Sequence, residues 1–146
     1  MDDPALDPRV RTGLVKGLDR LNRAIGTYFF FFRALEEHLN PLPDGQLSVL
    51  DIGSGHGAFP IRLARKGKLG RHSLRVVGSD VVPAYVEAAE AEARKSKAPV
   101  EFRTVDALKL DRLKDRFDVI TCTQAIHHFP PDFLAELMAR ARANAR

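Results

Sequence analysis

The densest group of residues able to do chemistry is an acid followed by three alternate glycines, in the segment Asp51-Ile52-Gly53-Ser54-Gly55-His56-Gly57. An apolar run, 47–52, leads into it, and a segment of helical periodicity, 59–66, follows. Glycines let the chain turn tightly and let a ligand approach the main chain, and a helix start offers free N–H groups. Several kinds of nucleotide site share such a turn, so it does not identify the ligand by itself. The acid before the first glycine does distinguish it from the G-x-G-x-x-G spacing of nicotinamide sites.

Two further acids follow apolar runs that have the composition of strands. Asp80 lies 23 residues after Gly57, where a carboxylate can accept hydrogen bonds from both hydroxyls of a ribose. Asp106 precedes Ala107 just after the next run, where a carboxylate can accept from the amino group of adenine. The carboxyl ends of parallel strands meet at one edge of a sheet, and ligands of open α/β sheets bind there. These acids therefore predict a site for a nucleoside-containing ligand.

The elements that must position these residues alternate between strand and helix. Strands are expected over 47–52, 74–77, 100–105 and 117–122, and helices over 59–66, 83–95 and 132–143. The charged segment 109–116 is left open between a short helix and coil. This alternation predicts an α/β fold with a parallel sheet and right-handed crossovers.

A helical layer is expected before the sheet. Asp7-Pro8 is a typical helix start, and Asn40-Pro41 ends the pattern. Gly26 is a candidate break between two helices. The apolar residues that set the helical period are Val10, Leu14, Leu18, Leu21, Ile25, Phe29, Phe32, Leu35 and Leu39. We therefore divide the chain into an N-terminal helical segment, 1–41, and a sheet-containing domain, 42–146.

Composition excludes several classes of protein. The chain has 146 residues, and Cys122 is its only cysteine, so it has no internal disulfide or cysteine-based zinc site. The five histidines show no metal-binding spacing, and we expect no metal. No apolar run approaches the ~18 residues needed to span a bilayer, so we expect a cytoplasmic protein with no membrane partner. The net charge is +4, but the basic residues are spread along the chain and interleaved with 19 acids. This distribution argues against a nucleic-acid partner.

Taken together, residues 47–129 resemble the class I S-adenosylmethionine (SAM)-dependent methyltransferases, in particular the small-molecule branch with the ubiquinone- and menaquinone-type enzymes. The histidine pair in the segment 124–129, after the fourth strand, also resembles that branch. The resemblance implies a Rossmann-like sheet of strand order 3-2-1-4 with flanking helices, SAM as the cofactor and a small-molecule methyl acceptor. SAM carries an activated methyl group, so such a site mainly aligns acceptor, methyl carbon and sulfur.

The resemblance also implies which residues bind the cofactor. The glycine turn would line the methionine part, Asp80 the ribose and Asp106 the adenine amino group. Residues after the fourth strand would meet the methionine end. The full set is Asp51, Gly53, Ser54, Gly55, Gly57, Asp80, Val81, Asp106, Ala107, Cys122 and Thr123.

For several of these residues, a purely structural role is an alternative to binding or catalysis. Asp51 could only cap the glycine turn, and Asp80 could only cap the next helix. His127 is a candidate general base or acceptor contact, because its pKa lies near neutrality, but it could equally serve in packing. The aromatic run 28–32 is expected in the core, or in part over the acceptor pocket.

The chain departs from the resemblance at its C-terminal side. A complete enzyme of this class has a seven-stranded sheet, whereas only four strands are expected here. We therefore expect a truncated protein whose apolar fourth strand lies at an edge and drives self-association, and which does not transfer methyl groups alone. A non-catalytic SAM-binding module is an alternative. A nucleic-acid methyltransferase is a weaker one, because Thr123-Gln124-Ala125-Ile126 stands in place of the Asn/Asp-Pro-Pro-aromatic motif of amino-methylating enzymes.

Overall fold

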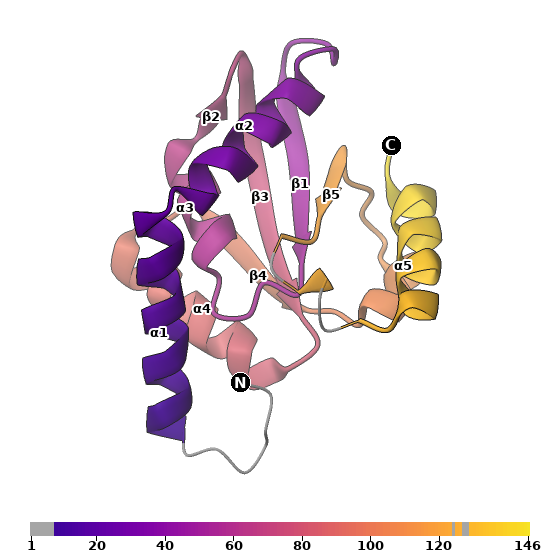
Figure 1. Cartoon of the computed structure of the whole chain (residues 1–146). Coiled ribbons are helices and arrows are strands. Elements are labelled where there is room, and N and C mark those ends of the chain that lie inside the picture. The colour runs from indigo at the N-terminus through magenta and orange to yellow at the C-terminus, as the bar shows by residue number, and fades with distance from the viewer. Residues whose placement is uncertain (1–7, 124, 127–128) are drawn as a thin grey trace.

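A computed structural model of the chain describes residues 8–123, 125–126 and 129–146 (Figure 1). The strands are β1 (Gln46–Ile52), β2 (Lys68–Leu69), β3 (His72–Asp80), β4 (Val100–Thr104) and β5 (Val119–Thr121). The helices are α1 (Pro8–Ala24), α2 (Thr27–Leu39), α3 (Ala58–Lys66), α4 (Pro83–Ser96) and α5 (Pro131–Asn144), with a 3-10 helix η1 (Ala107–Arg112). None of the helices in these residues is both long and apolar enough to cross a membrane.

The sheet has the predicted α/β topology. Its four parallel strands lie in the order β4-β3-β1-β5, which is the expected order 3-2-1-4. Val49 at the centre of β1 lies opposite Val76 of β3 and Val119 of β5. Six of the seven β1 residues are buried, as expected for the central strand of a sheet covered on both faces.

The structure adds a strand that the sequence analysis missed. β2 pairs antiparallel with the start of β3, with Leu69 opposite His72. It has two residues, and Gly67 and Gly70 flank it in left-handed backbone conformations. A strand of this length has no periodicity to detect. The open segment 109–116 is resolved in part, because η1 covers 107–112.

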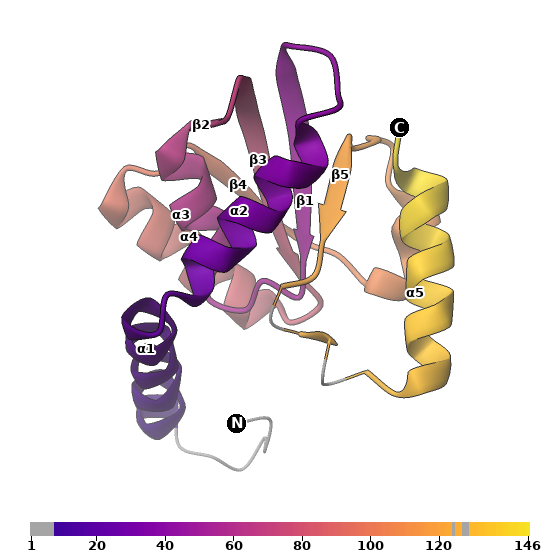
Figure 2. The ribbon, with the colours of Figure 1, turned by 45° about the horizontal axis from the view of Figure 1, so that its top comes forward.

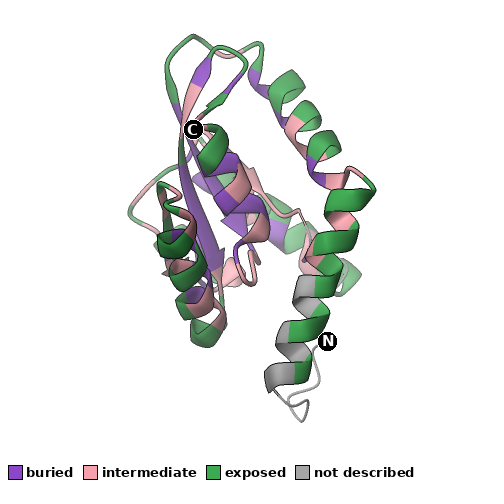
Figure 3. Ribbon diagram, turned by 90° about the vertical axis from the view of Figure 1, so that its left-hand side faces the viewer, coloured by how far each residue is buried: buried purple, intermediate pink, exposed green. Residues whose placement is uncertain are grey.

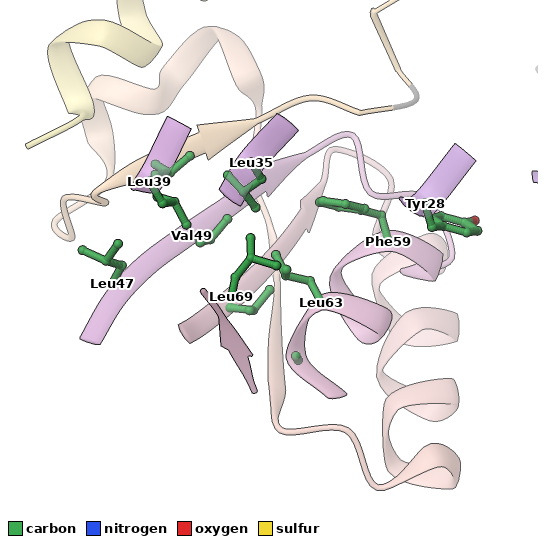
Figure 4. Close-up of a cluster of buried hydrophobic side chains, with 11 residues drawn as sticks. Tyr28, Leu35, Leu39, Leu47, Val49, Phe59, Leu63 and Leu69 are labelled. Atoms are coloured by element: carbon green, nitrogen blue, oxygen red, sulfur yellow. The ribbon is translucent and has the colours of Figure 1, made fainter. Parts of the chain in front are cut away.

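Helices cover both faces of the sheet (Figures 1 and 2). On one face, α2 and α3 pack on β1 and β3 through a cluster that includes Leu35, Leu39, Val49 and Leu63 (Figure 4). On the other face, η1 and α5 enclose a cluster that includes Leu50, Val77, Leu110, Phe117 and Leu137. α4 packs on β4, where Ala89 and Phe102 meet.

The N-terminal layer forms two helices, but they differ in burial. They separate at Gly26, whose positive φ of 75° redirects the chain. The apolar residues of α2 at positions 28, 35 and 39 are buried, whereas Val10, Leu14, Leu18 and Leu21 of α1 are exposed. Figure 3 shows α1 projecting from the body of the molecule with an exposed surface.

Candidate functional site

A cavity of about 500 Å³ opens at the carboxyl ends of the strands. That volume lies within the ~300–1,000 Å³ typical of small-molecule and cofactor sites. Nine of the residues singled out by sequence line it together: Asp51, Gly53, Ser54, Gly55, Asp80, Val81, Asp106, Ala107 and Thr123. They come from the ends of β1, β3 and β4, the segments that follow these strands, and Thr123 after β5. This grouping follows from the parallel topology, because it brings strand ends far apart in sequence to one edge.

The three glycines of the turn have different roles. All have positive φ, between 53° and 78°, which favours glycine. A side chain at Gly53 would collide with the Ala125 side chain, and one at Gly57 would collide with the Phe102 ring. Gly55 borders the cavity, and a Cβ there would meet no atom within 4 Å. Gly55 therefore leaves space that a ligand can use.

Gly57 and Cys122 do not line the cavity, which departs from the expectation for both. Gly57 is buried, and its missing Cβ lets Phe102 and Ala89 approach the turn. Cys122 packs beside the cluster under α5, where burial raises the pKa of its thiol to about 11. His127, the candidate base, lies outside the described residues.

Asp51 is a buried carboxylate at the base of the cavity. It is 1% exposed, and burial raises its pKa to about 6. Hydroxyl groups lower that pKa in part, because Thr121 donates to Oδ1 at 2.8 Å and Ser54 donates to Oδ2 at 2.8 Å. These bonds tie the end of β1 to β5 and to the glycine turn, and leave a negative charge near neutral pH inside the site.

Asp80 lines the cavity and also holds nearby backbone. Its Oδ2 accepts from the Gly55 N–H at 2.9 Å, and its Oδ1 accepts from the Val82 N–H at 3.0 Å. A carboxylate has roughly four acceptor positions, so about two remain for the two hydroxyls of a ribose. The capping alternative is therefore compatible with the binding role, since the same carboxylate holds the glycine turn and faces the cavity.

Asp106 lies at the adjacent wall. Its Oδ1 accepts from the Leu108 N–H at 3.0 Å and caps η1. The Lys109 ammonium lies 2.8 Å from Oδ2 and, together with that N–H, holds the pKa of Asp106 below its usual value. Asp106 is thus kept ionised and can accept from an amino group.

The remaining wall comes from residues that the sequence analysis did not assign to the site. α1 and α2 contribute Leu18, Asp19, Asn22 and Tyr28, and the segment after β5 contributes Phe129, Pro130 and Phe133. These residues are mostly apolar or aromatic, so the parts of the lining that they form suit an apolar ring. Only the aromatic run 28–32 gave a signal of this kind, through Tyr28.

A polar network fixes the helical layer beside the cavity. The Tyr28 hydroxyl donates to Asp19 Oδ1 at 2.8 Å, and Arg62 Nη2 donates to Asp19 Oδ2 at 3.0 Å. The Arg62 guanidinium also lies over the Tyr28 ring, 4.6 Å from its centroid. Burial and the Asp19 bond raise the pKa of Tyr28 to about 12, so its hydroxyl stays protonated as a donor. The network joins α1, α2 and α3.

No group of three or more His, Cys, Asp or Glu residues within the described ranges is arranged to hold a metal ion. The fold and the cavity together define an α/β protein with a Rossmann-like sheet and a site suited to a nucleoside-containing cofactor.

Comparison with known proteins identifies the family. The chain belongs to the methyltransferase-domain family, which matches residues 49–146. It is 33% identical over 99 residues to a ubiquinone biosynthesis O-methyltransferase of Cereibacter sphaeroides, covering 68% of this chain and 37% of that protein. It is 32% identical over 81 residues to a demethylmenaquinone methyltransferase of Deinococcus radiodurans, covering 56% and 32%. The chain therefore spans about a third of the length of these relatives.

Solved structures show the same fold. A SAM-bound magnesium protoporphyrin IX methyltransferase from Synechocystis superposes with a TM-score of 0.65 at 22% identity, over 97% of this chain and 61% of that one. A SAM-dependent methyltransferase from Clostridium acetobutylicum gives a TM-score of 0.67 at 18% identity, over 94% and 54%. These comparisons confirm the predicted fold class and the resemblance to SAM-dependent methyltransferases.

Proposed function

We propose that this chain binds SAM at the carboxyl ends of β1, β3 and β4. The observation that carries the proposal is Asp80, whose carboxylate holds the glycine turn and keeps acceptor positions toward the cavity. The open space at Gly55 and the cavity volume agree with a cofactor of this size. Family membership favours SAM over a nicotinamide cofactor, as does the acid before the first glycine.

We further propose that the protein transfers a methyl group to a small aromatic acceptor of the quinone type. SAM supplies an activated methyl group, so the protein has to align the acceptor and exclude water. Phe129, Phe133 and Tyr28 give part of the cavity lining the apolar, aromatic character that such a ring requires. The names of the relatives, a ubiquinone O-methyltransferase and a demethylmenaquinone methyltransferase, support the same acceptor class.

Calorimetric titration tests the cofactor. We expect SAM and its demethylated product to bind, and NAD not to bind. Asp80→Asn should weaken SAM binding by ~1–3 kcal/mol, since ribose hydroxyls lose a charged acceptor. Asp44→Asn is the matched control, because Asp44 is an exposed acid paired with Arg71 outside the cavity. Equal SAM affinity in wild type and Asp80→Asn would refute the assignment.

Transfer of labelled methyl from SAM tests the acceptor. Hydroxylated quinone-type rings should be labelled by a protein that carries the full length of the relatives, and RNA and DNA should not. Labelling of nucleic acid in place of the rings would overturn the acceptor class while leaving the cofactor assignment intact. SAM binding without transfer to either substrate class would instead support a non-catalytic SAM-binding module.

A further inference from the structure

α1 presents a regular apolar stripe to solvent. We define the α1 stripe as seven exposed apolar residues: four from α1, one from the turn after it and two from the start of α2, namely Val10, Leu14, Leu18, Leu21, Ile25, Phe29 and Phe30. At 100° per residue, the four from α1 fall within an arc of roughly 80° on the helix. Each residue of the α1 stripe is between 41% and 65% exposed. Figure 3 shows the exposed surface of the projecting helix.

This exposure is unusual because the residues are contiguous. Single exposed apolar side chains are common on soluble proteins, but larger continuous patches mark contact surfaces. Phe29 and Phe30, at the start of α2, contact each other edge to face and follow Ile25 closely in sequence. Of the exposed large apolar residues of the described chain, most belong to this one surface.

The charge of α1 indicates what the stripe contacts. By sequence, the helix holds five cations, Arg9, Arg11, Lys16, Arg20 and Arg23, against the single acid Asp19. Asp19 is already paired with Arg62 at 3.0 Å. The diameter of a helix, about 10–12 Å, is comparable to the electrostatic screening length of about 8 Å at physiological ionic strength. Its cations therefore still act on an anionic surface that its apolar side touches.

We propose that the α1 stripe docks α1 on the surface of an anionic lipid membrane. A helix that combines an exposed apolar stripe of Leu and Phe with an excess of cations lies in the plane of such an interface. A second copy of the chain would gain from covering the apolar residues but would meet the same positive charge. The expectation of no membrane partner rested on the length needed to span a bilayer, and a helix lying on the surface needs no such length.

The docking places the cavity next to the lipid. Leu18 belongs to the α1 stripe and also lines the cavity, as do Asp19 and Asn22 from the same helix. An apolar molecule dissolved in the membrane would then reach the cavity along α1. This consequence agrees with the proposed acceptor class, although the docking itself does not depend on it.

Vesicle sedimentation tests the docking. The chain should bind mixed phosphatidylcholine/phosphatidylglycerol vesicles, with binding that weakens at high salt and on pure phosphatidylcholine. The double substitution Leu14→Glu and Leu21→Glu should weaken binding about tenfold or more, because two inserted leucines are lost and two negative charges are added. Neither residue lines the cavity.

Met138→Glu is the matched control, because Met138 is 72% exposed on α5, away from the stripe. It should bind vesicles like the wild type. Thermal unfolding and circular dichroism should show the same fold in all three proteins, since the substituted residues are exposed. Equal vesicle binding by wild type and the stripe variant would overturn the proposal. The same holds if the stripe substitutions abolish a dimer seen by light scattering while no vesicle binding occurs, because the partner would then be a second copy.

Discussion

At the residue scale, the site depends on acids whose surroundings differ. Asp51 is buried and its pKa is raised, whereas Asp106 is stabilised as an anion by Lys109 and a backbone N–H. Both carboxylates border the same cavity. Of the two, only Asp51 lowers the free energy of unfolding when it is ionised at neutral pH, because its charge is buried. Such a cost is expected where a charge is kept for binding rather than for stability.

Asp51→Asn should therefore stabilise the fold while weakening SAM binding. The folded-state pKa, about 6, lies above the usual value of 3.8, so the folded protein binds the proton more tightly than the unfolded chain does. The contribution of Asp51 to stability is thus greatest at low pH and falls as the pH rises from about 4 to about 6. At pH 8, the substitution Asp51→Asn should raise the free energy of unfolding by roughly 1–3 kcal/mol.

Urea unfolding of both proteins at several pH values measures this effect. The gain from Asp51→Asn should shrink as the pH is lowered through 6 toward 4, because the wild-type carboxyl becomes neutral in the folded state. A loss of stability at pH 8 would show that the hydrogen bonds from Ser54 and Thr121 outweigh the cost of burying the charge.

At the element scale, the turn between β1 and α3 combines two physical requirements. Gly53 and Gly57 are needed because neighbouring side chains occupy the space of a Cβ, and Gly55 borders open space. The sequence pattern is the same for all three, so only the packing around each glycine separates structural from ligand-facing positions.

Gly55→Ala should abolish most SAM binding at a small cost in stability. Its φ of 53° disfavours alanine by about 1 kcal/mol, and the new methyl group would take up space at the border of the cavity. Gly67→Ala is the control: it has a φ of 68°, caps the end of α3, and its Cβ would meet only the Ala64 oxygen at 4.0 Å. Both variants should show similar losses in thermal unfolding, and only Gly55→Ala should lose affinity in calorimetry. Normal SAM affinity in Gly55→Ala would mean that Gly55 serves the backbone alone.

At the scale of the whole molecule, β5 lies at one edge of the sheet. It pairs with β1 on one side, and on its other side the described residues form only a single bridge, between Phe117 and Ala145, with Arg146 N–H donating to the Phe117 carbonyl at 2.9 Å. The backbone of Val119–Thr121 has no strand on that side within the described part of the chain.

An open edge of this kind should cause self-association. Light scattering over a concentration series should show a mass that rises above that of one chain, and amide exchange at 119–121 should slow as concentration rises. The Leu14→Glu, Leu21→Glu variant should associate like the wild type, because β5 lies away from α1. A single-chain mass at every concentration would show that α5 and the bridge protect the edge.

The sequence by itself determined the order of the sheet and which residues at the strand ends line one cavity. Asp51, Gly55, Asp80 and Asp106 follow apolar runs at spacings that leave few topologies, and parallel strands then bring their ends together. That reasoning is local, because each residue is placed by the strand directly before it in sequence.

Only the tertiary structure decided what the faces of the helices meet. The helical period placed Leu14 and Leu35 alike on apolar faces, yet Leu35 is buried on the sheet and Leu14 faces solvent. Periodicity reports which residues share a face and not what lies opposite it, which depends on the direction the chain takes at Gly26. For the same reason the contacts of Asp19 with Tyr28 and Arg62, and the separate roles of Gly55 and Gly57, required the packed structure: they join segments whose proximity no local spacing encodes.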